Sequence, residues 1–183
     1  MASIKLRPTG STGSNWNNMT NAHDGNESTC ASVSVSRLNY SSRYLSLNFD
    51  TSVIPSGATI NSATLTLRSK AGKTTITAHV DINGNSEYRV INQKQSTKAT
   101  NYTADVTSYM SDLTSVNVVV NNNNWSGNTF DLHELWIDVD YTEPVTPSGT
   151  FNIKLGNTTI NNIFIGNTKV TKVYIGNTLV FEN

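Results

Sequence analysis

The chain has 183 residues, of which 14% are charged and 36% hydrophobic, and its 13 basic and 13 acidic residues give a formal net charge of zero. A neutral chain lacks the positive field that binding to nucleic acid or to an acidic membrane requires, so the sequence predicts neither partner. Asn, Ser and Thr supply about two-fifths of the residues, and the hydrophobic share is sufficient for one core.

Further classes of protein are excluded by the lengths of the apolar runs, by the N-terminus and by the single cysteine. No apolar run approaches the roughly 18 residues of a membrane-spanning helix. Residues 1–8 lack the hydrophobic stretch of a secretory signal, so we expect synthesis in a bacterial-type host cytoplasm. Cys30 is the one cysteine, which excludes a disulfide within the chain and a cysteine-based zinc cluster.

Apolar and polar residues alternate with a period of two through much of 1–142, as is typical of half-buried β-strands. Turn-forming clusters separate the alternating segments at the spacing of an all-β sandwich. The apolar positions are Val33 and Val35; Leu45, Leu47 and Phe49; Ala63, Leu65 and Leu67; Ile76, Ala78, Val80 and Ile82; and Leu135, Ile137, Val139 and Tyr141. One segment, 105–113, has apolar residues at i, i+3, i+4 and i+7 instead, which predicts a short helix that closes one end of the sandwich.

The composition changes at 143–150, where two prolines and a Ser-Gly pair indicate an extended linker. Beyond the linker, 151–183 repeats the motif Leu/Ile-Gly-Asn-Thr with a ten-residue period. We expect each Gly-Asn pair to form a two-residue hairpin turn with positive φ. The turn residues are Gly156, Asn157, Gly166, Asn167, Gly176 and Asn177. The sequence therefore predicts a sandwich over 1–142, a linker, and a small β-meander of hairpins.

The repeat segment of 33 residues, 151–183, is below the size at which a chain usually buries a sufficient core alone. We expect its apolar positions to be covered by assembly or docking. These positions are Ile163, Ile165, Val170, Val173, Ile175 and Val180. The covering surface could be other copies of the chain, with a homotrimer expected, a partner assembly, or the chain's own sandwich.

Two stretches resemble known families. Residues 45–67, with Ile-Pro-Ser-Gly-Ala-Thr-Ile followed by Ala-Thr-Leu-Thr-Leu, resemble the core of DNRLRE-type jelly-roll sandwiches, which are similar to carbohydrate-binding modules. Asp105-Val-Thr-Ser-Tyr109 and residues 135–141 fit the same pattern. The resemblance implies an all-β, jelly-roll-like antiparallel sandwich, and it carries no catalytic motif.

The Ile-Gly-Asn-Thr-x-Val repeat is similar to C-terminal repeats in virion proteins of phages that infect Gram-positive bacteria. This likeness implies a non-enzymatic structural protein on the virion surface, as a head fibre, a capsid decoration protein or a tail-associated protein. Its partners would be capsid or tail proteins and a host cell-surface glycan. The alternative is a stand-alone carbohydrate-binding module.

Catalysis is not predicted, because the sequence has no nucleophile-base motif or paired carboxylates, and its histidines (His23, His79 and His133) are scattered and expected at the solvated surface.

Sugar binding typically uses exposed aromatic rings with amides and carboxylates around them. The candidate glycan contacts are Trp16 and Trp125 in polar segments, Trp136, which alternates out of phase with its apolar neighbours, and Tyr88. Alternatively, a tryptophan here covers an end or the second face of the sandwich, or Trp136 contacts another copy.

The loop 21–29 resembles the Ala-x-Asp-Gly-x-x-x-Thr turn of discoidin-like sugar-binding sandwiches, whose oxygens can hold calcium. The resemblance implies Asp24, Asn26 and Glu27 as ligands of a calcium ion, which takes about six to eight oxygens. Cys30 stands where that family often has an aromatic residue. The alternative is an ordinary Asp-Gly turn, with no cofactor of any kind.

Overall fold

A computed structural model describes residues 1–36, 43–122 and 125–144, and the strand segments 154–155, 158–159, 163–165, 168–170, 172–175 and 178–182. The chain divides into two compact units, Met1–Pro144 and Val145–Asn183. Residues 145–150 of the predicted linker lie outside the described residues.

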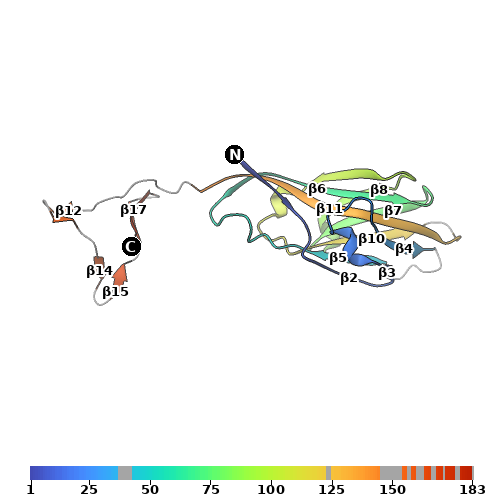
Figure 1. Cartoon of the computed structure of the whole chain (residues 1–183), viewed down its shortest axis with the longest axis horizontal. Helices are drawn as coiled ribbons and strands as arrows, with labels where there is room; N and C mark the ends of the chain where they lie inside the picture. The colour runs from blue at the N-terminus through green and yellow to red at the C-terminus, as the bar shows by residue number, and fades with distance from the viewer. Residues whose placement is uncertain are drawn as a thin grey trace. The chain divides into compact units, whose positions relative to one another are not determined.

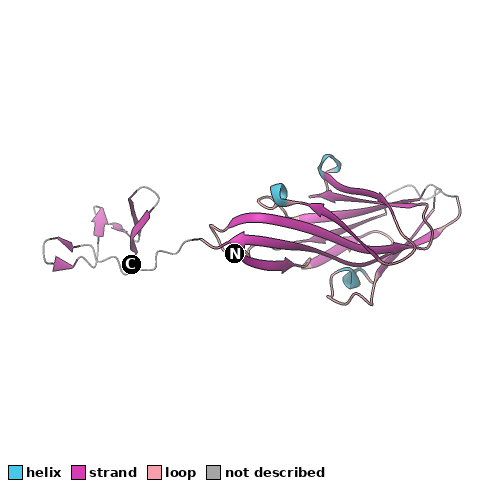
Figure 2. Ribbon diagram, turned by 90° about the horizontal axis from the view of Figure 1, so that it is seen from above, coloured by secondary structure: helices cyan, strands magenta, loops and turns pink. Residues whose placement is uncertain are grey.

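The first unit is a jelly-roll-like antiparallel β-sandwich, as predicted (Figure 1, Figure 2). One sheet contains, in spatial order, β3 (Trp16–Asn17), β4 (Ala31–Val35), β11 (Asn128–Thr142), β6 (Thr59–Ala71) and β9 (Thr100–Asp105), with β1 (Ala2–Leu6) also paired to β11. The second sheet contains β2 (Gly10–Gly13), β5 (Tyr44–Asn48), β10 (Ser115–Asn122), β7 (Ile76–Ile82) and β8 (Arg89–Lys94). Strands fill nearly all of both layers in Figure 2, and the helical turns lie in the connections between them.

The core lies between the two sheets and is filled by the alternating residues that the sequence predicts. Every apolar position named in the alternating segments is buried, from Val33 and Val35 through to Val139 and Tyr141. Their polar neighbours in each strand lie on the outer faces, as the period of two requires. The largest completely buried side chain is Phe130, in the first half of β11.

Strand β11 organises the first sheet, because it pairs with three other strands. It runs antiparallel to β6 along most of its length, while β4 pairs with its first half and β1 with its second half. The register with β6 shifts between Leu132 and Glu134, so His133 is an extra residue in a bulge. The bulge lies where the outer face of β11 meets the loop 23–30.

The predicted helix over 105–113 is wrong, since the segment forms only the 3₁₀ turn η4 (Thr107–Tyr109). The Asp105 carboxylate accepts hydrogen bonds from the Thr107 N–H at 2.9 Å and from its hydroxyl at 2.6 Å. The Thr107 oxygen in turn accepts from the Ala63 N–H at 2.9 Å, which fixes the turn to β6. These local bonds compete with a helix that is too short to be stable alone. Of the four apolar residues in the helical spacing, Val106, Met110 and Leu113 are buried, whereas Tyr109 is half-buried.

The other described helical segments are also single 3₁₀ turns, η1 (Met19–Ala22) and η3 (Ser86–Tyr88). Within the described residues, no helix is long and apolar enough to cross a membrane.

The second unit contains three hairpins, each a separate two-stranded antiparallel sheet. They are β12 (Lys154–Leu155) with β13 (Thr158–Thr159), β14 (Ile163–Ile165) with β15 (Thr168–Val170), and β16 (Lys172–Ile175) with β17 (Thr178–Glu182). Leu155 pairs with Thr158, and the other two ladders close in the same way, which leaves two residues for each turn as predicted.

The Gly-Asn turn residues themselves lie outside the described residues: Gly156, Asn157, Gly166, Asn167, Gly176 and Asn177. Among the apolar positions expected to dock, Val170 and Val173 are half-buried. The side chains of Ile163, Ile165, Ile175 and Val180 are not among those that the structure describes.

Candidate functional site

Trp16 is buried, so the prediction that it contacts a glycan from an exposed loop is wrong. Only 7% of the residue is exposed, and its ring meets Phe130 edge to face, with centroids 5.9 Å apart and an interplanar angle of 88°. Asn15 and Asn18 adopt positive φ on either side of β3. The Asn-rich sequence therefore marks the two ends of a very short strand, and the pairing of β3 with β4 turns Trp16 into the core.

Trp136 lies on the outer face of the first sheet, as its phase predicts, but it is covered and only 7% exposed. The Lys5 ammonium lies 4.5 Å from the ring centroid, and the indole N–H donates to Asp138 at 2.7 Å. Lys5 also pairs with Asp138 at 3.6 Å. Strand β1 therefore closes the ring off by a cation–π contact, and the prediction that Trp136 is an exposed glycan contact is wrong.

The loop 23–30 is an ordinary turn. The Asp24 carboxylate accepts from the Asn26 N–H and from the Thr29 hydroxyl, both at 2.8 Å. The Asn26 side chain accepts from the Ser28 N–H at 3.0 Å, and Glu27 pairs with Arg68 at 3.0 Å. Each implied calcium ligand is thus engaged within the protein, and in the described ranges no cluster of three His, Cys, Asp or Glu residues is suited to a metal. The calcium site that the resemblance implies at Asp24, Asn26 and Glu27 stays a prediction.

Beneath this loop lies a buried carboxylate that the sequence pattern did not reveal. The side chain of Glu134 is 1% exposed, accepts from the Gly25 N–H at 2.6 Å and pairs with Arg7 at 3.4 Å. Burial raises its pKa, and the bonds from Gly25 and Arg7 only partly offset this effect. His133, in the bulge, is also buried, and its Nδ1 donates to the Glu27 carbonyl at 3.0 Å. The expectation of a solvated His133 is therefore wrong, because the loop docks on the bulge.

The exposed aromatic residues that remain accessible include Tyr88 and Trp125, with exposed fractions of 45% and 61%. Trp125 follows β10 at one end of the sandwich, next to residues 123–124, which are not described. Tyr88 ends η3 in the connection between β7 and β8, at the opposite end of β10. Both agree with the sequence prediction of exposed rings.

Tyr88 is accompanied by Tyr109, a partner that sequence reasoning missed. The two rings lie 5.5 Å apart, tilted by 45°. They line a hollow of about 300 Å³ together with Asn83, Ser108 and Asp112. We call these five residues the tyrosine site. The helical spacing of 105–113 predicts Tyr109 on the buried face of a helix, but the 3₁₀ turn leaves it half-buried beside Tyr88.

Asn83 holds the two connections of the tyrosine site together. It has φ of 52°, a conformation that asparagine tolerates better than most residues. Its Nδ2 donates to the Asp112 carbonyl at 2.8 Å, and its Oδ1 accepts from the N–H groups of Thr114 at 2.9 Å and Ser115 at 3.1 Å. The side chain thus fixes the 107–114 segment against the end of β7.

The carboxylate of Asp112 completes the site. Asp112 is exposed, and among the described residues its carboxylate has no hydrogen-bond or ion-pair partner. Its backbone is held on both sides, since its N–H donates to the Tyr109 carbonyl at 3.2 Å and its own carbonyl accepts from Asn83. Asp112 thus lines the same hollow as two aromatic rings, and a carboxylate with rings is suited to a ligand with C–H faces and hydroxyl donors.

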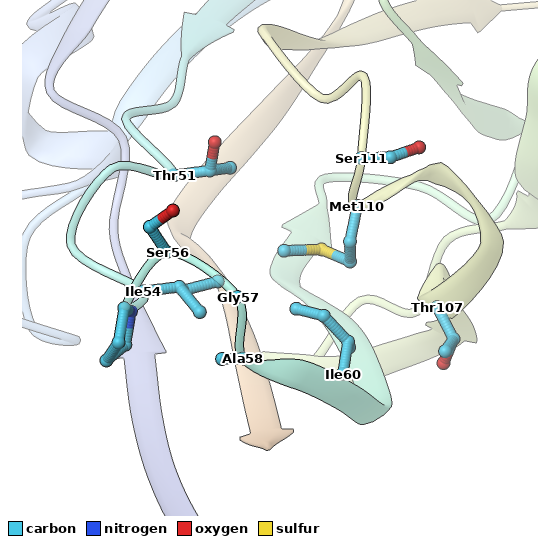
Figure 3. Close-up of a pocket in the computed structure, with 10 residues that line it drawn as sticks. Thr51, Ile54, Ser56, Gly57, Ala58, Ile60, Thr107, Met110 and Ser111 are labelled. Carbon is cyan, nitrogen blue, oxygen red and sulfur yellow. The ribbon is translucent and has the colours of Figure 1, made fainter. Parts of the chain in front are cut away.

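A second hollow, of about 480 Å³, lies on the other side of the 107–112 turn (Figure 3). Ile54, Ile60 and Met110 point into it, as Figure 3 shows, and the loop 51–58 forms one wall. This loop contains two tight turns, closed by the Ile54 N–H to Thr51 and the Ala58 N–H to Pro55, both at 3.0 Å. We call this feature the apolar hollow.

Comparisons with known proteins give distant structural likenesses. No protein-family model matches the sequence, and no curated protein matches it. The CBM32 of AlyQ in complex with 4,5-unsaturated mannuronic acid is similar with a TM-score of 0.44 and 13% identity, over 73% of this chain and 97% of that one. Truncated AlyQ with CBM32 and alginate lyase domains is similar with a TM-score of 0.42 and 15% identity, over 83% of this chain and 36% of that one.

Glu134→Gln is expected to change how stability depends on pH. Because burial raises the pKa of Glu134 above its ordinary value of 4.5, its proton contributes stability below that pH, and this contribution is lost as the pH rises through the raised pKa. Glutamine keeps an uncharged acceptor for the Gly25 N–H. The free energy of unfolding of the variant should therefore rise relative to wild type between about pH 4 and pH 7, as measured by urea denaturation.

Asp24→Asn is the matched control, with the opposite sign. Desolvation raises the pKa of Asp24, but the hydrogen bonds from Asn26 and Thr29 outweigh it, and the pKa lies below 3.8. The ionised form thus contributes stability above that pH, which is lost as the pH falls through the lowered pKa. Relative to wild type, the variant should lose stability as the pH rises through the range below about pH 4, and the difference should stay nearly constant from about pH 5 to pH 7. The same trend in both variants would contradict the account of this loop.

Proposed function

We propose that the sandwich unit is a non-catalytic carbohydrate-binding module whose ligand binds at the tyrosine site. The observation that carries the proposal is the accessible Tyr88 ring tilted against Tyr109, with Asp112, whose carboxylate has no partner among the described residues, lining the same hollow. The apolar face of a sugar ring packs on an aromatic side chain, while its hydroxyl groups donate to a carboxylate. The connections that carry these groups are held in place by Asn83 before any ligand binds, which lowers the entropic cost of binding.

The net charge of the chain favours a neutral glycan as the ligand, and the number of carboxyl groups at the site favours binding over hydrolysis. A formal net charge of zero favours no strongly charged polymer. Glycoside hydrolysis in most families requires two carboxyl groups facing each other, about 5–10 Å apart. The lining of the tyrosine site, all of it within the described residues, contains the single carboxyl group of Asp112.

The proposal extends to where the module is displayed. We assign the chain to the virion surface of a phage of Gram-positive bacteria, as a head fibre, decoration or tail-associated protein, on the likeness of its Ile-Gly-Asn-Thr repeats. The second unit would provide attachment, to copies of itself in a homotrimer or to a capsid or tail protein. A two-stranded hairpin is marginally stable alone, so three separate hairpins favour burial against another surface.

Tyr88→Ala tests the binding site. A glycan array that includes Gram-positive cell-wall polysaccharides should identify a ligand, and titration calorimetry should then show affinity at least about tenfold weaker for the variant. Affinity falls because the variant removes the exposed ring on which the sugar packs. The fold should be unaffected, because Tyr88 is not a core side chain.

Trp125→Ala is the control, since it removes another exposed ring, at the opposite end of β10. It should bind with wild-type affinity. Loss of binding in Trp125→Ala with wild-type affinity in Tyr88→Ala would place the ligand at the other end, and an empty array would contradict glycan binding altogether.

Light scattering on the full chain and on a chain ending at Pro144 tests the attachment role. A trimer that becomes a monomer on truncation is the expected result, because the truncation removes the unit of hairpins. A trimer in both cases would contradict assembly through the repeats, and a monomer in both would contradict self-assembly and favour docking on a capsid or tail protein.

A further inference from the structure

The tyrosine site and the apolar hollow share one segment of chain. Ser108, Tyr109 and Asp112 line the first, while Thr107, Met110 and Ser111 line the second. The 107–112 turn therefore contributes residues to both hollows, so a ligand long enough to span this turn from Tyr88 contacts both.

The chemistry of the apolar hollow differs from that of a site for hydroxyl groups alone. Ile54, Ile60 and Met110 point into it, and Figure 3 shows Ile54 and Met110 directed toward each other across the space. A sugar hydroxyl placed between them would lose water without gaining a partner, which costs free energy. A methyl group in the same position gains affinity through burial of apolar surface.

The rim adds groups that can bond to an amide. Thr51 and Ser56 also line this hollow, and a hydroxyl can both donate and accept. The Ser111 hydroxyl is directed away from Ile54 and Met110 in Figure 3. By contrast, the Thr107 hydroxyl already donates to Asp105 and accepts from Ala63. An apolar floor with hydroxyls at its edge matches a group that carries a methyl at its tip and an amide at its base.

The loop that forms the wall is fixed in the free protein. Gly57 has φ of 81°, a conformation for which glycine is favoured, and it lies within the tight turn that the Ala58 N–H closes on the Pro55 carbonyl. Ile54 and Ile60 also pack against the core from this loop. The hollow is thus preformed.

From this geometry we infer that the ligand is an acetamido sugar, with the chain of a 2-acetamido-2-deoxyhexose polymer on Tyr88 and an acetyl methyl group between Ile54 and Met110. The inference rests on the proposed function, because it names the substrate class of the same site. Unmodified hexose polymers bind through the tyrosine site alone and more weakly.

The test compares two ligands that differ only at C2, the β-1,4-linked trimers of N-acetylglucosamine and of glucose. Titration calorimetry with the full chain should give an affinity for the acetamido trimer about fourfold to tenfold tighter, the gain expected from burying one methyl group and its contacts. Saturation-transfer NMR should show the strongest transfer at the acetyl methyl protons. Equal affinity for the two trimers, or weak transfer to the methyl, would overturn the inference and leave glycan binding intact; binding of neither would overturn both.

Ile54→Ser tests the residue directly. It should reduce the preference for the acetamido trimer to less than about twofold and leave the affinity for the glucose trimer unchanged. Val53→Ser is the matched control, since Val53 is 53% exposed and does not line the hollow; it should keep the wild-type preference. An Ile54→Ser protein that binds both trimers with the wild-type preference would overturn the role of the hollow. If the variant does not fold, saturation transfer to the acetyl methyl protons in the wild-type protein decides the question.

Discussion

The hydrogen bonds of the Asn83 side chain are the constraint on which the tyrosine site depends. One short amide donates to Asp112 and accepts from Thr114 and Ser115, so it ties the 107–114 segment to the end of β7 beyond the last pair of the β7–β10 ladder. Aspartate would lack the donor, glycine would lack both groups, and most other side chains disfavour the positive φ found here. Each such bond contributes about 1 kcal/mol, and together they hold the segment that carries Tyr109 and Asp112 at the end of β7.

The same sandwich uses its other aromatic and charged groups for stability. The Trp16 ring fills the core against Phe130, and Lys5 covers the Trp136 ring on the outer face. Glu134 is buried under the loop 23–30, which its carboxylate holds through Gly25. These contacts close much of the outer face of β11, and they leave accessible rings at the two ends of β10. A strand of 8 residues separates those ends by about 27 Å.

The alternation of apolar residues predicts the β-sandwich from the sequence, because each strand buries one of its two faces in the core. It predicted the buried sides of β5, β6 and β7 and the second half of β11, since those strands are paired on both sides or packed against the opposite sheet. The ten-residue repeat likewise predicted where each hairpin closes. Local pattern and tertiary structure agree in these segments.

The candidate site could be predicted only in part, because long-range contacts decide which polar segments stay open. Trp16 and Trp136 have sequence surroundings typical of exposed rings, and only the pairing of distant strands covers them. Tyr109 and Asp112 were missed because the helical spacing of 105–113 hid the bonds from Asp105 and Asn83 that prevent a helix. Nothing local in the sequence shows that Glu134 lies beneath a loop more than a hundred residues earlier in the chain.

The most direct test of the central claim is to map the bound glycan by amide chemical-shift perturbation, with backbone assignments of the full chain. Titration with a glycan that the protein retains should shift the amides of 83–88 and 107–114, the two connections that Asn83 joins. The amides of 125–128, beside Trp125, should not move. Shifts confined to 125–128 would contradict the account, because the tyrosine site would then not be where the ligand binds.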